Sequence, residues 1–339
     1  MYNFLNSFFT HLGIDLGTAN TIVYADGLGY VVNQPSVIAF KQGFKVLAFG
    51  HEAKEMLGKT GQSIRVIRPL ADGVIADFEA GEELVKAFIK SANVPRYRIG
   101  RVIMGVPTGI TEVEKIAVIE SAEQAGAREV YLIEEPMAAA IGLGLDVKGK
   151  EAHMIVDIGG GTTDIAVINY GGIVVDNTIR VAGDELNEAI VRYFKNQYQM
   201  RIGEFTAERM KIDFGTVSEK YNGKAVTVKG LDIKTGMPRQ LVLPSSFFID
   251  ALHDITEVIV NAVLNTLEKL PAELVNDLVD RGIILSGGGA LLKGLDDLLT
   301  ERTTLPVSIA DNALYSVAEG TRLIIEDFKY FKNLLMSRM

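Results

Sequence analysis

Two short glycine-rich segments carry residue types that can hold phosphate groups and a divalent cation. Residues 15–20 read DLGTAN and residues 157–164 read DIGGGTTD, so each segment begins with an aspartate, Asp15 or Asp157. Glycine lets the backbone approach a ligand closely, and amide N–H groups can then surround phosphate oxygens. An aspartate at the end of the preceding strand can hold a hydrated divalent cation. Such turns can also serve only to reverse the chain, but two copies of Asp-x-Gly followed by Thr or Asn favour phosphate binding.

A carboxylate that could act on an attacking water lies between these two segments. Glu135 precedes Pro136 and opens a helix of small residues that includes Ala138 to Ala140. At the end of a strand, such a side chain can orient or activate a water for attack on a γ-phosphate. The same position also suits a favourable negative charge at a helix N-terminus, and both interpretations stay open at this point.

Two further segments have residue types that suit a nucleoside. Residues 286–290 read SGGGA and join an apolar strand to a helix, which allows close backbone approach to a flat ligand such as adenine. The same glycines could serve strand-to-helix packing alone. Glu208 and Lys211 are three positions apart on one predicted helix face and could flank a ribose. On spacing alone, a solvated surface pair is the simpler interpretation.

The two phosphate-type segments belong to an internal repeat. Residues 13–32 resemble residues 156–175, with Asp15 placed 142 positions before Asp157. In each copy the glycine turn joins one apolar strand to another, and a second tight turn leads to a third strand. Rossmann and Walker A loops instead run from a strand into a helix. Two copies near half the chain length predict two similar domains that face each other across a cleft.

The remaining pattern alternates helices with strands, which predicts an α/β fold. A helix from Thr111 has a capping box with Glu114 and a stop signal at Gly126. The region up to Pro69 is punctuated by glycine and charge, which indicates an inserted subdomain. The other expected elements are helices over 82–90, 184–199, 206–213 and 247–269, strands over 101–106, 130–133, 282–285 and 307–310, two strands within 225–243, and a last helix from 312.

Length and composition exclude several other classes of protein. The 339 residues predict about two domains, and the absence of cysteine excludes disulfides, thiol catalysis and cysteine-ligated metal sites. A net charge of −9 without a basic stripe argues against nucleic acid as a partner. No apolar run approaches the roughly 18 residues of a membrane-spanning helix. The apolar start lacks a basic flank, since the first Lys or Arg is Lys41, so secretion is not expected.

Five motifs in order resemble those of the actin, sugar-kinase and heat-shock chaperone ATPase superfamily. They read GIDLGTANT, IEEPMAAAIG, VDIGGGTTD, TAERMK and LSGGGALLKG, and they are similar to its phosphate-1, connect-1, phosphate-2, nucleotide-contact and adenosine motifs. Within the superfamily, the sequence most resembles the bacterial actin MreB family, and the resemblance covers nearly the whole chain. The resemblance implies an actin-like fold of two duplicated βββαβαβα domains, each with a smaller inserted subdomain, and ATP with Mg²⁺ in the interdomain cleft. The implied subdomains are IA (1–32, 70–142 and 318–339), IB (33–69), IIA (143–181 and 247–317) and IIB (182–246).

The resemblance also assigns roles to individual residues. It makes Glu135 and Thr162 the catalytic pair and directs Asp15 and Asp157 toward magnesium through water. The implied nucleotide-binding residues are Thr18, Ala19, Asn20, Gly160, Gly161, Thr162, Glu208, Lys211, Gly288, Gly289, Ala290 and Leu291. The phosphate-1 loop contains no Lys or Arg, so we expect slow, strictly metal-dependent hydrolysis. One departure is Phe205, which stands where the family usually has an arginine.

Membrane contact is expected from two features of the chain ends. Phe4, Leu5, Phe8 and Phe9 would form one apolar face if the N-terminal segment is helical; a hydrophobic arm packed on the domain is the alternative. The basic, amphipathic end of the last helix, from Phe328, could attract anionic lipid, although a C-terminal helix more commonly docks onto its own domain. The loop over 93–97 lacks the paired apolar residues that some relatives insert into membranes.

The interpretation of the whole sequence is an actin-like cytoskeletal ATPase that forms ATP-dependent, membrane-associated filaments and maintains bacterial cell shape. The expected partners are other copies of the chain, as paired protofilaments, the inner face of the cytoplasmic membrane, and membrane proteins of the shape or elongation machinery. The expected location is therefore cytoplasmic and peripheral to that membrane. A small-molecule kinase of the same superfamily is the alternative, but no acceptor-binding loop is evident. A chaperone ATPase would normally continue into a peptide-binding domain.

Overall fold

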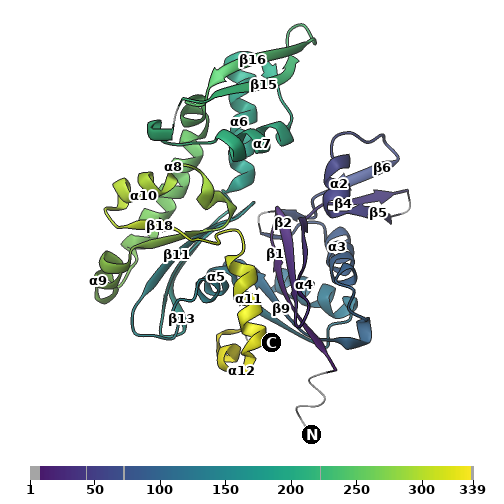
Figure 1. Cartoon of the computed structure of the whole chain (residues 1–339), viewed down its shortest axis with the longest axis vertical. Helices are drawn as coiled ribbons and strands as arrows, with labels where there is room; N and C mark the ends of the chain where they lie inside the picture. The colour runs from purple at the N-terminus through teal and green to yellow at the C-terminus, as the bar shows by residue number, and fades with distance from the viewer. Residues whose placement is uncertain (1–7, 43, 72, 222, 337–339) are drawn as a thin grey trace.

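The computed structural model describes residues 8–42, 44–71, 73–221 and 223–336. Two five-stranded sheets form its centre, and helices cover their faces (Figure 1). The first sheet has the order β10-β9-β1-β2-β3, and the second has the order β13-β12-β11-β17-β18. Their strands are β1 (Thr10–Leu16), β2 (Asn20–Ala25), β3 (Gly29–Pro35), β9 (Ile99–Val106) and β10 (Glu129–Glu134), then β11 (His153–Ile158), β12 (Thr163–Asn169), β13 (Gly172–Ile179), β17 (Ile283–Ser286) and β18 (Val307–Ile309).

The internal repeat is confirmed by the strand pairing. Each sheet opens as an antiparallel meander of three strands, and the next strand joins the first one in parallel. Leu12 pairs with Ala25 in the first sheet, and Met154 pairs with Val167 in the second. Both partners are therefore shifted by the same 142 positions that separate Asp15 from Asp157. We call β1 through α5 the first unit and β11 through α11 the second unit.

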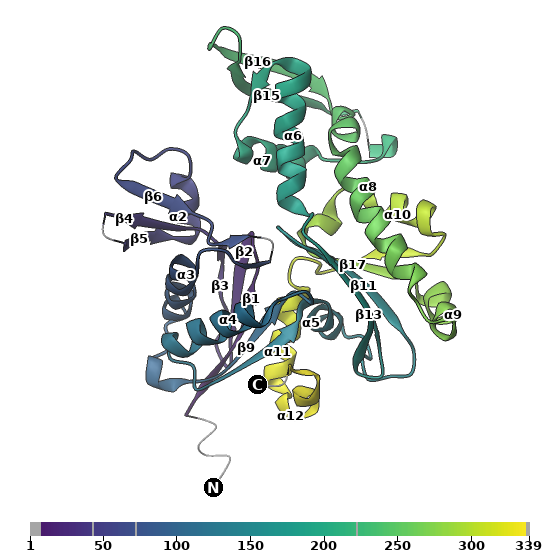
Figure 2. The same ribbon diagram turned by 180° about the vertical axis from the view of Figure 1, so that it is seen from behind.

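Each unit carries helices and a small inserted region. The helices of the first unit are α3 (Phe78–Ser91), α4 (Glu112–Ala125) and α5 (Glu135–Gly142), and those of the second are α6 (Gly183–Tyr198), α8 (Phe247–Glu268), α9 (Ala272–Arg281), α10 (Leu295–Thr303) and α11 (Ser316–Glu326). The first insertion holds β4 (Ile38–Lys41), β5 (Lys45–Phe49), α2 (Gly50–Met56) and β6 (Ile64–Ile67), followed by the short pair β7 (Leu70–Ala71) and β8 (Val74–Ile75). The second holds β14 (Met200–Arg201), α7 (Glu204–Phe214), β15 (Ala225–Asp232) and β16 (Pro238–Pro244). Figure 2 shows the two inserted regions on the same side of the molecule, beyond the ends of the two sheets.

The predicted helix signals at α4 are present in the structure. The Thr111 hydroxyl accepts a hydrogen bond from the backbone N–H of Glu114, at 3.3 Å, and the Glu114 carboxylate accepts one from the N–H of Thr111, at 2.8 Å. Gly126 ends the helix with a left-handed φ of 117°, which glycine adopts without strain. Helix α9 was missed by the sequence prediction, which placed no element between the helix over 247–269 and the strand over 282–285. In the structure Pro271 is the N-cap residue of α9.

Helices α5 and α11 lie between the two sheets, and each packs on the sheet of the other unit. Helix α5 follows the last strand of the first unit but packs on β11 and β12, while α11 follows the last strand of the second unit and packs on β1, β9 and β2. The two helices cross closely, since a Cβ added to Gly142 would lie 2.0 Å from the carbonyl oxygen of Ser316. One added to Gly320 would lie 1.9 Å from the carbonyl oxygen of Ala138. Glycine is therefore required at both crossing points.

The end of the chain differs from the prediction of one continuous amphipathic helix. Helix α11 ends at Glu326, Asp327 leaves the helical conformation, and a short helix α12 (Phe328–Phe331) follows. Phe328 docks against β10, with its ring 5.1 Å from that of Tyr131 and 3.5 Å from the guanidinium of Arg101. The backbone N–H of Met336 donates to the carbonyl of Leu132 at 2.9 Å. The described part of the tail thus docks on β9 and β10 of the first unit and, through Tyr330, on Lys148 before β11; docking was the alternative to lipid contact.

Candidate functional site

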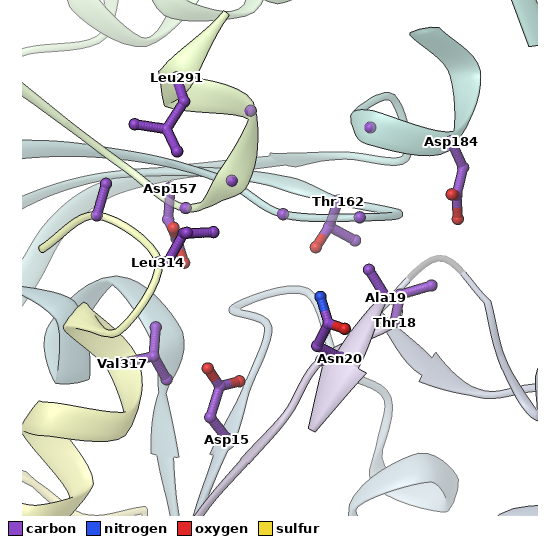
Figure 3. A pocket seen from close by; sticks show the side chains of 18 of the residues that line it. Asp15, Thr18, Ala19, Asn20, Asp157, Thr162, Asp184, Leu291, Leu314 and Val317 are labelled. Carbon is purple, nitrogen blue, oxygen red and sulfur yellow. The ribbon is translucent and has the colours of Figure 1, made fainter. Parts of the chain in front are cut away.

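A cavity of about 420 Å³ lies between the two units, where the glycine turns after β1 and β11 face each other. Figure 3 shows Asp15 and Asn20 on one side of it and Asp157 and Thr162 on the other. The predicted site residues that line the cavity are Asp15, Thr18, Ala19, Asn20, Glu135, Asp157, Gly160, Thr162, Glu208, Lys211, Gly288, Gly289 and Leu291. The structure therefore brings together residues that are distant in sequence.

Two of the predicted residues do not line the cavity. Gly161 lies at the turn of the second loop and is not part of the lining. Ala290 is fully buried and belongs to the hydrophobic core of the second unit. The SGGGA segment does not lead straight into a helix, as had been expected, but forms a single 3₁₀ turn over Gly288–Leu291. Within this turn, the side chain of Ala290 faces the core.

The two phosphate-type loops approach each other closely. A Cβ added to Gly160 would lie 2.8 Å from the Cβ of Ala19 and 2.9 Å from its backbone nitrogen. Any larger side chain at Gly160 would therefore push the loops apart. A third segment joins them, because the Thr18 hydroxyl accepts a hydrogen bond from the backbone N–H of Gly73 at 3.0 Å. Thr18 and Thr162 are both 5% exposed, so these loops leave little room for bulk water.

Three carboxylates line the floor of the cavity. Burial and the charge of Asp157 raise the pKa of Asp15 to about 7, and burial and the charge of Asp164 raise the pKa of Asp157 to about 7. Burial also raises the pKa of Glu135 well above its usual value, and the charges of Asp164, Asp15 and Asp157 add to this effect. Three acids that oppose one another's ionisation form a site that attracts positive charge.

The carboxylates fit a hydrated divalent cation. Oxygen Oδ1 of Asp157 is buried and has no hydrogen-bond partner within the described chain. Among the described residues that line the cavity, Lys211 is the only Lys or Arg, and its ammonium donates to the carbonyl of Gly183 at 2.6 Å. In the ranges that the structure covers, no three His, Asp or Glu side chains are grouped so as to hold a metal ion by themselves. The arrangement therefore suits an ion that keeps its water shell and is held by Asp15 and Asp157 through that water.

Apolar side chains line another part of the cavity, which suits a nucleoside. Leu291 comes from the 3₁₀ turn, Ile212 from α7 and Leu314 from the loop before α11, and these side chains are 50%, 68% and 52% exposed. Glu208 and Lys211 lie on the same side as Ile212, one helical turn apart. Burial lowers the pKa of Lys211 to about 8. Lys211 is thus largely buried beside the cavity, which contradicts the simple solvated-pair interpretation for this residue.

Several lining residues were missed by the sequence prediction. They include Asp184 and Asn187 on α6, Leu314 and Tyr315 before α11, and Asn33 on β3. Asn187 is 4% exposed, and its carboxamide oxygen has no hydrogen-bond partner within the described chain. Asp184 and Asn187 lie in the stretch VAGDELNEAIVRY, residues 181–193, which also resembles the MreB family, and no pattern marked the loop before α11.

Ion pairs join the first inserted region to α6 and α7 of the second unit across the mouth of the cavity. The ammonium of Lys54 on α2 lies 3.0 Å from the carboxylate of Glu208 on α7. The guanidinium of Arg68 lies 2.8 Å from Asp184 and 3.1 Å from Glu204. We call these three ion pairs the clasp.

Phe205, the residue that departs from the family pattern, lies beside the clasp. The Lys54 ammonium is 5.3 Å from the centre of the Phe205 ring, which is within the range of a cation–π contact. The phenyl ring therefore supports the cation that pairs with Glu208. Phe205 contacts the first inserted region instead of supplying a charge at this position.

Comparison with known proteins gives consistent matches over nearly the whole chain. Residues 9–333 match the family model described as MreB/Mbl protein. The chain is 46% identical to the cell shape-determining protein MreB of Escherichia coli K12, covering 94% of this chain and 93% of that protein. It is also 46% identical to the cell shape-determining protein Mbl of Bacillus subtilis 168, covering 93% of this chain and 96% of that protein.

Solved structures share the same fold. The crystal structure of MreB5 of Spiroplasma citri bound to ADP matches with a TM-score of 0.91 at 36% identity, covering 96% of this chain and 98% of that one. A second structure of MreB5 is bound to AMPPNP and matches with the same TM-score at 35% identity, covering the same shares of both chains. The MamK double helical filament matches with a TM-score of 0.80 at 21% identity, over 94% of this chain and 98% of that one, and this likeness concerns the fold alone.

Proposed function

The chain belongs to the MreB/Mbl family, and from this premise we propose that it is an actin-like ATPase whose assembly depends on ATP and Mg²⁺. Its role is that of an actin-like cytoskeletal protein in cell shape, as the names of its relatives indicate. The alternative of a small-molecule kinase gains no support from these relatives. The observation that carries the proposal is the pair of duplicated loops that face each other across one cavity, with Asp15 and Asp157 at its floor.

ATP is the nucleotide we assign to the cavity. The relative MreB5 has been solved with ADP and with AMPPNP, and the cavity here offers a phosphate end and an apolar nucleoside end. We assign the phosphates to Thr18, Ala19, Asn20, Gly160 and Thr162, and the nucleoside to Glu208, Lys211, Gly288, Gly289 and Leu291. Gly161 would contribute through its backbone alone. The four-subdomain boundaries given above remain part of this proposal.

Magnesium would supply the positive charge that the phosphate loops lack. Asp15 and Asp157 would hold it through water, in keeping with the absence of a three-residue metal-ligand group among the described residues. Their own part is to fix the hydrated ion at the floor of the cleft and to neutralise it. We expect hydrolysis to stop when the divalent ion is removed.

Glu135 and Thr162 are the residues we assign to hydrolysis. They approach the phosphate end from different units, Glu135 at the start of α5 and Thr162 just before β12. Glu135 can accept a hydrogen bond from the attacking water, and the Thr162 hydroxyl can hold that water in place. Because α5 packs on β11 and β12, Glu135 is held beside the loop that carries Thr162, while the phosphate residues Thr18 to Asn20 come from the first unit. We expect hydrolysis to need the closed subunit, because only closure brings the first phosphate loop and the second loop onto the same phosphates.

We also propose that the protein associates with the membrane. The proposal is supported by an exposed aromatic surface on the first unit, formed by Phe8 and Tyr97. Phe8 is 48% exposed and Tyr97 is 66% exposed, with ring centres 6.2 Å apart. The guanidinium of Arg98 lies 5.5 Å from the Phe8 ring, and that of Arg128 lies 4.1 Å from the Phe9 ring. Aromatic and basic side chains together suit the interface of an anionic bilayer.

The chain ends contribute differently to this proposed membrane surface. Phe4 and Leu5, which were also predicted to contact the membrane, lie outside the described residues. The helices in the described ranges are all too short or too polar to span a bilayer. We propose a peripheral contact with the membrane surface. Phe328 would not take part in it, because its ring packs against Tyr131 and Arg101.

The experiment that tests the proposal measures assembly and phosphate release together. Light scattering should show a concentration threshold for polymer that is lower with ATP and Mg²⁺ than with ADP, since a ligand favours the closed form only by its differential affinity. Head-to-tail contacts that do not close into a ring then build a filament. A protein that hydrolyses ATP yet stays monomeric at every concentration, with Mg²⁺ and lipid present, would contradict the proposal.

A further inference from the structure

Asn187 is a buried carboxamide that lines the cavity and has no part in the function proposed so far. It lies on α6 and is 4% exposed. Its oxygen Oδ1 is buried and accepts no hydrogen bond from any residue that the structure describes. A buried polar group without a partner costs free energy, and a hydrogen bond from a ligand would remove that cost. Asn187 is therefore a candidate for contact with the molecule that occupies the cavity.

The neighbouring polar side chains of the cavity already have partners. Asp184, on the same helix, and Glu208, on α7, are both held in the clasp. The Lys211 ammonium donates to the carbonyl of Gly183 at 2.6 Å. Each of these three groups can bind a ligand only by sharing or leaving its partner, whereas the Asn187 oxygen has no partner to lose. Asn187 is thus the neighbour best prepared to form a new hydrogen bond.

The position of Asn187 is between the phosphate loops and the residues assigned to the nucleoside. The start of α6 is tied to the second phosphate loop, because the backbone N–H of Asp184 donates to the carbonyl of Gly160 at 2.8 Å. The carbonyl of Gly183 accepts from Lys211 of α7, which we assign to the nucleoside. Asn187 comes four positions after Gly183, so the two residues lie on one helix face, one turn apart. The part of a nucleotide that joins the phosphates to the base is the sugar.

The chemistry of the carboxamide also fits a sugar. The group accepts hydrogen bonds at its oxygen and donates them at its nitrogen, and a hydroxyl likewise donates and accepts. The base has a place of its own beside the apolar side chains of Leu291, Ile212 and Leu314. A buried group that pairs with a ligand hydroxyl is left unpaired when that hydroxyl is missing, and such a site rejects the analogue. Asn187 would therefore distinguish ribose from deoxyribose.

We propose that Asn187 forms a hydrogen bond with the ribose hydroxyls of the bound nucleotide and makes the cavity selective for ribonucleotides over deoxyribonucleotides. The proposal rests on the assignment of ATP to this cavity and adds the residue that recognises the sugar. The contact belongs to binding and not to hydrolysis, so ADP should show it as fully as ATP. Binding can then be measured with ADP, in the absence of the ATP that assembly is proposed to require.

The test compares the binding of ADP, 2′-deoxy-ADP, 3′-deoxy-ADP and inosine diphosphate, each with Mg²⁺, by isothermal titration calorimetry. The wild-type chain should bind at least one of the two deoxy nucleotides about tenfold more weakly than ADP, the effect of one lost hydrogen bond to a buried group. Asn187→Leu keeps the size of the side chain but removes both polar ends. It should reduce the preference for ADP over that deoxy nucleotide to about twofold or less.

A second buried asparagine provides the matched control. Asn169 on β12 is 8% exposed, its Oδ1 also lacks a hydrogen-bond partner among the described residues, and it does not line the cavity. Asn169→Leu should therefore keep the wild-type preference for ADP. Asn187→Ala is the second variant at the site, and it should lose the preference as Asn187→Leu does, so the test does not depend on the folding of one variant.

Three results would overturn the proposal. The first is a wild-type chain that binds ADP and both deoxy nucleotides equally, and the second is a preference that persists unchanged in the folded Asn187 variants. The third is a variant that changes the ratio of ADP to inosine diphosphate affinity instead, which would place the contact at the base. A wild-type chain that binds none of the four nucleotides would refute the assignment of a nucleotide to the cavity, and that failure is recognised before any variant is measured.

Discussion

Asp15 and Asp157 hold equivalent positions in the two halves of the repeat, and their carboxylates face the same cavity from opposite units. Each is the last residue but one in the first strand of its unit, just before the glycine loop. The charge of Asp157 contributes to the raised pKa of Asp15. The repeat thus places two carboxylates that repel each other beside one cavity. A cation bound between them would reduce that repulsion.

This relationship predicts how stability without metal depends on pH. The pKa of both aspartates is raised in the folded chain from 3.8 to about 7, so the folded state holds protons that the unfolded state releases. The stability that these protons contribute is present below the unfolded value and is lost as pH rises through about 7. The melting temperature without metal should therefore be lower at about pH 8 than at about pH 6.

Magnesium should reverse this trend, because it replaces the protons. We expect the rise in melting temperature caused by Mg²⁺ with ADP to be larger at about pH 8 than at about pH 6, with affinity falling about tenfold per displaced proton for each pH unit below 7. Differential scanning fluorimetry measures both series. Asp15→Asn should flatten the dependence, and a metal effect that is independent of pH would contradict the assignment.

Glu135→Ala should separate chemistry from binding. Phosphate release should fall by about 100-fold or more while ADP and ATP affinities stay near wild type, because a water-orienting group acts mainly in the transition state. Glu134→Ala is the matched control, since Glu134 is the adjacent acid and does not line the cavity. Equal losses of affinity and turnover in Glu135→Ala would assign it a structural role instead.

The clasp should slow nucleotide release. Lys54→Ala and Arg68→Ala each remove part of the clasp. The paired side chains are about one-third exposed or less, except that of Glu204. Such pairs are weak, so each substitution should speed ADP release by no more than about fivefold. Rising salt should have the same effect on the wild type. Stopped-flow displacement of a fluorescent ADP measures these rates.

A surface ion pair away from the cavity provides the control for the clasp. Lys86 pairs with Glu82 and Glu83 on α3, and Lys86→Ala should leave the release rate unchanged. Release that is insensitive to salt and to Lys54→Ala would show that the mouth of the cavity does not limit exchange.

The aromatic surface at Phe8 and Tyr97 should bind anionic vesicles. Arg98→Glu should weaken co-sedimentation about fivefold or more, because each basic side chain near such a surface contributes about 1 kcal/mol and the acid adds repulsion. Tyr97→Ser should weaken binding as well. Arg192→Glu, on the exposed face of α6, is the control for charge. Unchanged binding in Arg98→Glu and Tyr97→Ser would leave residues 1–7 as the remaining candidate.

The sequence alone was enough to predict those parts of the site that lie in glycine-rich turns or next to strands with a clear apolar pattern. Asp15, Asp157 and Thr162 were identifiable because the repeat doubled their signal, and Gly126 because a helix stop has a defined geometry. Side chains that meet only through tertiary structure left no local signal. Lys54 and Glu208 are 154 positions apart, and neither is unusual in its own helix.

The local sequence pattern gave a wrong prediction where tertiary packing determines the conformation of the chain. The apolar spacing after Phe328 continues that of α11, so the sequence indicated one helix. In the structure Asp327 turns the chain, and Phe328 finds its place between Tyr131 and Arg101. The family resemblance placed Ala290 at the nucleotide, but in the 3₁₀ turn its side chain enters the hydrophobic core.

The exchange of α5 and α11 also has a consequence for the order in which the chain folds during synthesis. A ribosome delivers the first unit long before α11, yet α11 supplies part of the cover of β1, β9 and β2. That face of the first sheet stays uncovered until almost the entire chain has been made. The newly made N-terminal half therefore exposes apolar surface for most of its synthesis, and is the form that chaperones would need to protect. The lining of the nucleotide cleft is completed in the same late step, because Leu314 to Val317 belong to it.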